Sequence, residues 1–434
     1  MQLIGLLGVL VMIGLAALAS ENRSRIPWRL VAAGVAVQAG LAAVLLALPV
    51  ISDGFTWLAR AVTGVIDRAA AGISFIFGPE LGDPNGPMGV VFAIHVLPVI
   101  IFFASLMAVL YHVGVMQRLI AALAWLMRRT LGVTGAEAMA MAANVFVGQT
   151  EAPLTVKPLI DRMTRAQLMT LMVGGFATIA GSVFAAYVQM LGGEDPAERI
   201  AFARHLITAS VMSAPAAFVM ARILVPEIAT PPDEHLAGLG VTHDRDSNVL
   251  DAAAAGATDG LKLALNVGAM LIAFLSLLAL VNWPLELLSG LGPIEAWREA
   301  HGIPVLSLEV ILGWLLAPLA WCLGVPWAEA QLVGSLLGQK VLVTEFVAFA
   351  NLGDALHPGD GAAPLLSERS GQIAAYALCG FANFGSIAIQ IGGLSAIAPG
   401  RRKDFAALAL RAMLGGALAS WMTASIAGVF IGGR

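Results

Sequence analysis

Long apolar stretches alternate with short polar segments along most of the chain. A transmembrane helix needs about 20 mostly apolar residues. Stretches of this kind predict eight spans, at residues 2–19, 28–49, 90–115, 167–191, 200–225, 260–281, 372–396 and 405–431. Because no basic residues precede the apolar run 2–19, we interpret it as a retained span, with a cleaved signal sequence as the alternative.

Two further apolar segments, 136–158 and 328–352, contain polar residues and glycines in their middle. The interruptions are Asn144, Gly148, Gln149, Glu151 and Pro153 in the first segment and Gly334, Gly338, Gln339, Lys340 and Glu345 in the second. Backbone groups at such breaks cannot stay unpaired in lipid, but they are tolerated where they line a cavity or lie inside the protein. The pattern therefore predicts two re-entrant helical hairpins with polar tips, in an all-α integral membrane protein.

Basic residues in the loops orient the predicted spans. Four clusters, at residues 23–29, 118–129, 157–165 and 401–403, fall on one side if eight spans cross and the hairpins do not. The positive-inside rule makes that side cytoplasmic, which puts both termini outside. The segment 307–322 is long enough to suggest a ninth span, but a further crossing would move the last cluster outside. We assign it to the membrane interface or to the outer part of the second hairpin region.

The two interrupted segments belong to an internal repeat. Gly148-Gln149-Thr150-Glu151 in the first half has a counterpart in Gly338-Gln339-Lys340 with Glu345 in the second. The motif Gly175-Phe176-Ala177-Thr178 likewise has a counterpart in Gly380-Phe381-Ala382-Asn383. Each half is thus predicted to hold a polar hairpin followed by a broken helix. With one hairpin entering from each side, the repeat is inverted, and such interrupted pairs are typical of the binding site of a transporter.

This organisation predicts six regions. They are peripheral helices at 1–89, a scaffold span with an interfacial helix at 90–133, the first hairpin and broken helix (transport) at 134–192, scaffold spans and a cytoplasmic loop at 193–306, the second hairpin region and broken helix (transport) at 307–398, and a final scaffold span at 399–434.

Composition agrees with a membrane protein. Of the 434 residues, 59% are hydrophobic and 12% are charged, against about 25% charged residues in soluble domains. The net charge of −4 offers no basic surface for nucleic acid. The two cysteines lie in apolar stretches and do not form a disulfide framework.

The motifs resemble those of one transporter family. Gly148-Gln149-Thr150-Glu151-Ala152-Pro153-Leu154 resembles the first-hairpin signature of concentrative nucleoside transporters. Ser367-Glu368-Arg369-Ser370 and the run from Cys379 to Ser386 resemble the late motif of that family, in matching order. The resemblance implies a homotrimer in a bacterial inner membrane, in which a mobile transport domain moves nucleosides such as uridine past a fixed scaffold.

The resemblance also implies the site residues. The base-binding set is Gln149, Thr150 and Glu151 with Val183 as an apolar wall, and the ribose-binding set is Glu345, Asn383 and Ser386 beside Phe381. The sodium set is Asn144, Val147, Thr150, Thr178 and Ile179, partly through main-chain carbonyls. One position departs from the family pattern, because Thr344 stands where the family has Asn.

The residue types alone point to similar chemistry. An amide such as Gln149 both donates and accepts, which suits the edge of a base, and a carboxylate such as Glu345 accepts strong hydrogen bonds from hydroxyls. Sodium requires hard oxygen donors, which Asn144, Thr150, Thr178 and backbone carbonyls offer. No organic cofactor is expected.

Other interpretations remain open at this stage. In one alternative, Glu151 takes a coupling proton in place of sodium. A carrier of small anions would need a cation at the site, for which Lys340 and Arg369 are the candidates. An intramembrane enzyme would need a nucleophile with a base, or clustered metal ligands, and the sequence has neither pattern. Each of these residues could also have a purely structural role. Glu151 and Glu345 would then form ion pairs, and Asn383 and Ser386 would hydrogen-bond the backbone groups left unpaired at the helix break.

Overall fold

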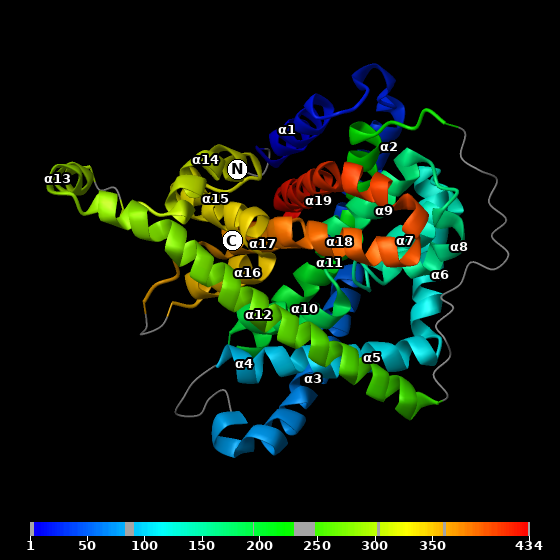
Figure 1. The fold of residues 1–434 in the computed structure, drawn as a ribbon, viewed down its shortest axis with the longest axis horizontal. Coiled ribbons are helices and arrows are strands. Elements are labelled where there is room, and N and C mark those ends of the chain that lie inside the picture. The colour runs from blue at the N-terminus through cyan, green and yellow to red at the C-terminus, as the bar shows by residue number, and fades with distance from the viewer. Residues whose placement is uncertain are drawn as a thin grey trace.

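The chain is helical throughout the part that the structure, a computed structural model, describes: residues 4–82, 91–193, 195–229, 248–301, 304–358 and 362–432 (Figure 1). In the first half the helices are α1 (Ile4–Leu18), α2 (Trp28–Ala42), α3 (Pro49–Gly82), α4 (Phe92–His95), α5 (Leu97–His112), α6 (Val115–Leu131), α7 (Gly135–Asn144), α8 (Lys157–Ile160), α9 (Arg165–Ala177), α10 (Gly181–Gly192) and α11 (Pro196–Leu224). In the second half they are α12 (Val249–Ser289), α13 (Gly292–Ala300), α14 (Leu308–Cys322), α15 (Trp327–Leu342), α16 (Glu345–Leu356), α17 (Glu368–Leu378), α18 (Phe384–Ile397) and α19 (Arg402–Phe430).

Seven helical segments in these ranges are long and apolar enough to cross a membrane. Six match predicted spans: Trp28–Ala47, Phe92–His112, Arg165–Gly192, Pro196–Leu224, Val249–Ser289 and Pro399–Phe430. The seventh, Ile51–Gly78, lies in α3, where the sequence analysis predicts no span; Asp53, Arg60 and Asp67 lie within this segment.

The two remaining predicted spans take other forms. Residues 2–19 contain α1, a helix of 15 residues. Residues 372–396 divide between α17 and α18, which are separated by the break that the sequence predicts.

The segment 307–322 lies beside the second hairpin. Ser307 caps α14 by accepting from the Val310 amide (3.2 Å), and α14 and α15 meet at an angle of 115°. Gly334 allows close packing, because a Cβ added there would lie 2.8 Å from the Ala317 nitrogen. Helix α14 therefore packs against α15 of the second hairpin.

Helices α5 and α12 form a closely packed pair (Figure 1). Gly256 and Gly260 lie on the contact face of α12, where an added Cβ would come within 2.6 Å of Ala108 and 2.8 Å of Ala104. Small residues at this spacing let membrane helices approach closely. Most of the remaining surface of α12 is exposed or half-buried, whereas most of α11 is buried.

Both halves of the chain repeat one order of elements. A hairpin (α7 with the 3₁₀ turn Ala152–Val156, or α15 with α16) is followed by a broken helix (α9 and α10, or α17 and α18) and then by a helix of 29 residues (α11 or α19). The motif alignment predicted from sequence is shifted, however. Gly148-Gln149 lies in the first hairpin tip, whereas Gly338-Gln339 lies inside α15.

The two helix breaks meet at the centre of the protein. Gly380, with φ of 127°, passes so close to the end of α9 that an added Cβ would lie 2.7 Å from the carbonyl oxygen of Phe176. Only glycine adopts this backbone conformation readily, and only glycine leaves room for the contact. The close approach brings the hairpin tips and both breaks together.

Candidate functional site

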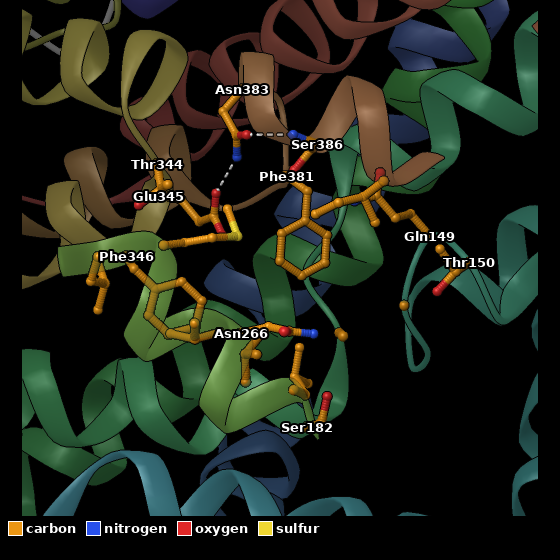
Figure 2. Close-up of a pocket in the computed structure, with 18 of the residues that line it drawn as sticks. Gln149, Thr150, Ser182, Asn266, Thr344, Glu345, Phe346, Phe381, Asn383 and Ser386 are labelled. Atoms are coloured by element: carbon orange, nitrogen blue, oxygen red, sulfur yellow. Dashed lines mark hydrogen bonds between the residues drawn. The ribbon is translucent and has the colours of Figure 1, made fainter. Parts of the chain in front are cut away.

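One cavity lies where the hairpin tips, the breaks and α12 converge. It has a volume of about 240 Å³ and is lined by all eight residues of the predicted substrate set: Gln149, Thr150, Glu151, Val183, Glu345, Phe381, Asn383 and Ser386. Figure 2 shows Glu345, Asn383 and Ser386 on one side of this space and Gln149 and Thr150 on another. The fold therefore brings the two predicted half-sites into one cavity.

Glu345 is the first residue of α16 and is 3% exposed. Thr344 caps this helix by accepting from the Val347 amide (3.3 Å), so threonine performs a capping role at the position where the family pattern has Asn. A carboxylate at a helix N-terminus is favoured by the helix dipole. The capped helix thus holds Glu345 at the cavity wall.

Two donors fix the Glu345 carboxylate. The Tyr187 hydroxyl donates to Oε1 (3.1 Å), and the Asn383 amide donates to Oε2 (2.6 Å; Figure 2). Tyr187 is itself held by Phe349, with ring centroids 4.4 Å apart. Lys340 donates to the Ala377 carbonyl and Arg369 to the carbonyls of Gly324 and Gly428, so the proposed structural ion pair is replaced by neutral donors.

Asn383 combines a structural and a site function. Its Oδ1 caps α18 by accepting from the Ser386 amide (2.7 Å), which is the purely structural role considered from sequence. Its Nδ2 donates to Glu345. The side chains of Asn383 and Ser386 both still line the cavity. The cap therefore orients the polar wall around Glu345.

The first hairpin tip supplies the other polar wall. The side chain of Gln149 is buried, and its Oε1 has no hydrogen-bond partner among the described residues. A buried amide oxygen without a partner is costly, and a ligand in the cavity can remove that cost. Glu151, in contrast, is exposed.

Sequence reasoning missed several cavity residues. Asn266 and Met270 come from α12, which has no break or repeat motif, and Phe346 and Ser182 follow known motif residues (Figure 2). A polar residue inside the apolar run of α12 is the one signal that marks Asn266. Tyr187 had a weaker signal as one of three tyrosines in the chain.

Part of the predicted sodium set gathers behind the first hairpin tip. Asn144 ends α7 and is 1% exposed, and neither polar atom of its side chain has a partner among the described residues. A Cβ added to Gly174 would lie 3.1 Å from Asn144 Nδ2, and the Thr178 hydroxyl donates to the Gly174 carbonyl (3.0 Å). Asn144 and Thr178 thus share one neighbour at the end of α9.

The backbone also ties this region together. The amide of Gly181, at the start of α10, donates to the Phe146 carbonyl (2.9 Å), so Val147 and Ile179 belong to segments that are joined directly. Thr150 lies on the cavity side of the tip and packs against Gly393 of α18. The carbonyls and side chains between α7 and the α9 break are hard oxygen donors of the kind that suit an alkali cation.

Polar hairpin tips, broken helices and a central cavity define a secondary transporter. Residues 7–80 and 205–428 match the family models described as the N-terminus and the C-terminus of "Na+ dependent nucleoside transporter", and residues 93–194 match "Nucleoside recognition". The chain belongs to the Na⁺-dependent nucleoside transporter family, and it is a transporter and not an enzyme.

Several relatives of similar sequence are named as transporters. An "Uncharacterized transporter" of Haemophilus influenzae is 44% identical, covering 98% of this chain and 97% of the relative. "Nucleoside permease NupC" of Helicobacter pylori is 38% identical (99% and 98% covered). "Sodium/nucleoside cotransporter 1" of the rat is 37% identical over 99% of this chain, which spans 64% of that longer protein.

Among solved structures, CNTnw in an inward-facing substrate-bound state is 43% identical with a TM-score of 0.86, covering 99% of this chain and 98% of that one. A variant of CNTnw in an intermediate state has a TM-score of 0.87 at 43% identity and covers 100% of both chains. Variants of CNTnw also adopt an outward-facing state. CNTnw and its variants thus adopt both inward-facing and outward-facing states.

Proposed function

We propose that this chain carries a nucleoside, together with Na⁺, across the cytoplasmic membrane of a bacterium. The central observation is the Glu345 carboxylate, held by Tyr187 and Asn383 at the wall of a cavity that also contains Gln149. A nucleoside has a flat base with donors and acceptors and a ribose with adjacent hydroxyls. The cavity offers an amide to bind the base and a carboxylate to bind the ribose.

In this proposal the ribose hydroxyls donate to Glu345 and contact Asn383 and Ser386. The base lies against Val183 and bonds Gln149, Thr150 and Glu151, and Phe381 lies beside the ribose. A site built on hydrogen bonds rejects analogues that lack the partner group far more strongly than an apolar pocket does. Analogues without ribose hydroxyls are therefore expected to be poor substrates.

Sodium would bind between the end of α7 and the break after α9. Asn144 and Thr178 would contribute side-chain oxygens, and Val147 and Ile179 would contribute carbonyls. The partial negative charge at the C-terminal end of α9 favours a cation there. Because Glu151 belongs to the same hairpin tip, the ion would also lower the cost of placing that carboxylate in the membrane.

The packing suggests how the site could move. We propose that the α5–α12 pair stays fixed while the buried bundle around α9, α11 and α19 travels with both hairpins, as an elevator. This differs from the partition expected from sequence, in which 193–306 and 399–434 belong to the scaffold. The exposed apolar face of α12 suits a homotrimer interface, with both termini outside.

Thr178→Val is expected to raise the Na⁺ concentration for half-maximal uptake about three- to tenfold. Valine keeps the shape of threonine but removes the hydroxyl oxygen from the proposed ion site. The measurement is labelled uridine uptake into proteoliposomes as a function of Na⁺ at constant ionic strength. An unchanged Na⁺ dependence would remove Thr178 from the ion site.

Tyr187→Phe is expected to weaken uridine binding about tenfold, because Glu345 loses one of the two donors that orient it. The aromatic contact with Phe349 is kept, so the variant should fold. Tyr376→Phe is the matched control, since that buried hydroxyl bonds His205 and not Glu345. Equal affinities for the two variants would exclude the positioning role of Tyr187.

Calorimetric binding to the purified protein tests the proposal as a whole. Uridine should bind in NaCl and bind at least tenfold more weakly in choline chloride, and 2′,3′-dideoxyuridine should bind poorly in both. Equal uridine binding in the two salts would contradict the sodium site. Equal binding of the two nucleosides would contradict the ribose assignment.

A further inference from the structure

The first arms of the two hairpins can be aligned residue by residue. Asn144-Val145-Phe146-Val147 corresponds to Lys340-Val341-Leu342-Val343, and a Thr-Glu pair follows each run. In the first hairpin, Gly148 and Gln149 are inserted before that pair. The alignment places Lys340 of the second half opposite Asn144 of the first.

Backbone hydrogen bonds support this register. The last helical bond of the first arm runs from the Val147 amide to the Ala143 carbonyl (2.9 Å), and its counterpart runs from Val343 to Gln339 (2.8 Å). Asn144 and Lys340 each follow the accepting residue directly. The two side chains therefore leave their helices at equivalent positions in the last turn.

Both side chains also contact the last turn of the helix that follows their hairpin. Asn144 lies against Gly174 in the last turn of α9, and Lys340 Nζ donates to the Ala377 carbonyl in the last turn of α17 (2.8 Å). The final carbonyls of a helix lack intrahelical partners and carry partial negative charge. Each broken helix thus presents a cation-attracting end to the first arm of its hairpin.

The two positions differ in what occupies them. Asn144 has polar atoms without partners, whereas the Lys340 side chain is fully buried, with Nζ also donating to Ser420 Oγ (2.7 Å). A buried ammonium group is costly unless it is paired, and the two oxygen acceptors of Lys340 reduce this cost. Its position and its partners are those of a bound cation.

We propose that the second half contains a latent cation site and that the ammonium group of Lys340 permanently occupies it. Lys340 is then a positioning residue that does for the second hairpin and Glu345 what Na⁺ does for the first hairpin and Glu151. The ribose half-site is set without an ion, and only the first half responds to Na⁺. This inference rests on the proposed function for the identity of the first ion site.

The test removes the first site and opens the second. Three variants of Lys340 are made in a protein that also carries Asn144→Ala. Lys340→Asn gives the second half the residue type of the first. Lys340→Met fills the space without a charge or an ion ligand, and Lys340→Arg keeps the charge. Lys262→Asn is the matched surface control, because that lysine side chain is 68% exposed on α12. The readout is the Tm of the purified full-length protein as NaCl replaces choline chloride.

Lys340→Asn with Asn144→Ala is expected to gain a saturable rise in Tm of about 3 °C with Na⁺. Lys340→Met, Lys340→Arg and Lys262→Asn in the same background should show none. With Asn144 intact, Lys340→Arg should retain more uridine binding than Lys340→Met. Absence of a Na⁺ response in the asparagine variant, or wild-type uridine binding by Lys340→Met, would overturn the inference.

The same measurement distinguishes a wrong ion site at Asn144 from a wrong latent site at Lys340. If wild-type protein ignores Na⁺ while the Lys340→Asn variant responds to it, the ion site at Asn144 is wrong and the latent site stands. If wild-type protein responds and the variant in the Asn144→Ala background does not, the latent site is wrong and the first ion site stands.

Discussion

Glu345→Gln is expected to lower uridine affinity about 100-fold. The change removes the charge that strengthens two hydrogen bonds from the ribose hydroxyls, each of which contributes about 1.5–3 kcal/mol when one partner is charged. The amide also presents an NH₂ group to the donors Tyr187 and Asn383, which disturbs the wall of the site. Titration calorimetry with the purified variant measures this effect directly.

A second ligand makes this test specific. Wild-type protein should prefer uridine strongly over 2′,3′-dideoxyuridine, and Glu345→Gln should lose most of that preference. Glu286→Gln, at an exposed position of α12, is the control for the substitution itself. If the variant keeps wild-type discrimination between the two nucleosides, Glu345 does not bind the ribose.

Asn144→Ala is expected to raise the Na⁺ concentration for half-maximal uridine uptake at least tenfold. Its buried side chain has no partner among the described residues, so its oxygen is available to the ion, and alanine removes it. Binding of Na⁺ and of nucleoside are linked, so the uridine affinity at fixed Na⁺ should fall as well. Uptake and binding measured across a Na⁺ series report both effects.

The control for this substitution is Asn22→Ala, at an exposed turn outside the hairpins. It should leave both the Na⁺ response and the uridine affinity unchanged. An Asn144→Ala protein that is folded and keeps the wild-type Na⁺ response would contradict the assigned ion site.

Much of the fold follows from sequence because breaks in apolar helices are easy to recognise. The interruptions around Gln149 and Glu345 predicted both hairpins, and the Gly-Phe-Ala motifs marked both broken helices. The prediction that failed was the residue-by-residue alignment of the two hairpin motifs. Gly338-Gln339 resembles Gly148-Gln149, but α15 continues through its pair whereas α7 ends before the other, since only the first tip has the two extra residues.

One span and some site residues were not predicted from sequence, for different reasons. Charged residues in α3 dilute its apolar pattern, so Ile51–Gly78 has a mean hydropathy of 1.3, the lowest of the seven candidate spans, and is easily overlooked. In the site, all eight predicted substrate residues line one cavity. Asn266 of α12 also lines it, and Tyr187 of α10 bonds Glu345 without lining the cavity; no local motif marks either residue. Their roles depend on tertiary packing, which a single sequence does not encode in any local pattern.

Labelled uridine uptake into proteoliposomes, with an inward Na⁺ gradient compared with an inward proton gradient, tests the central claim most directly. The account predicts accumulation driven by Na⁺ alone, with no accumulation under the proton gradient. Uptake driven only by protons would contradict sodium coupling and make Glu151 the first candidate for the coupling group. Folded protein that takes up no uridine under either gradient would contradict nucleoside transport itself.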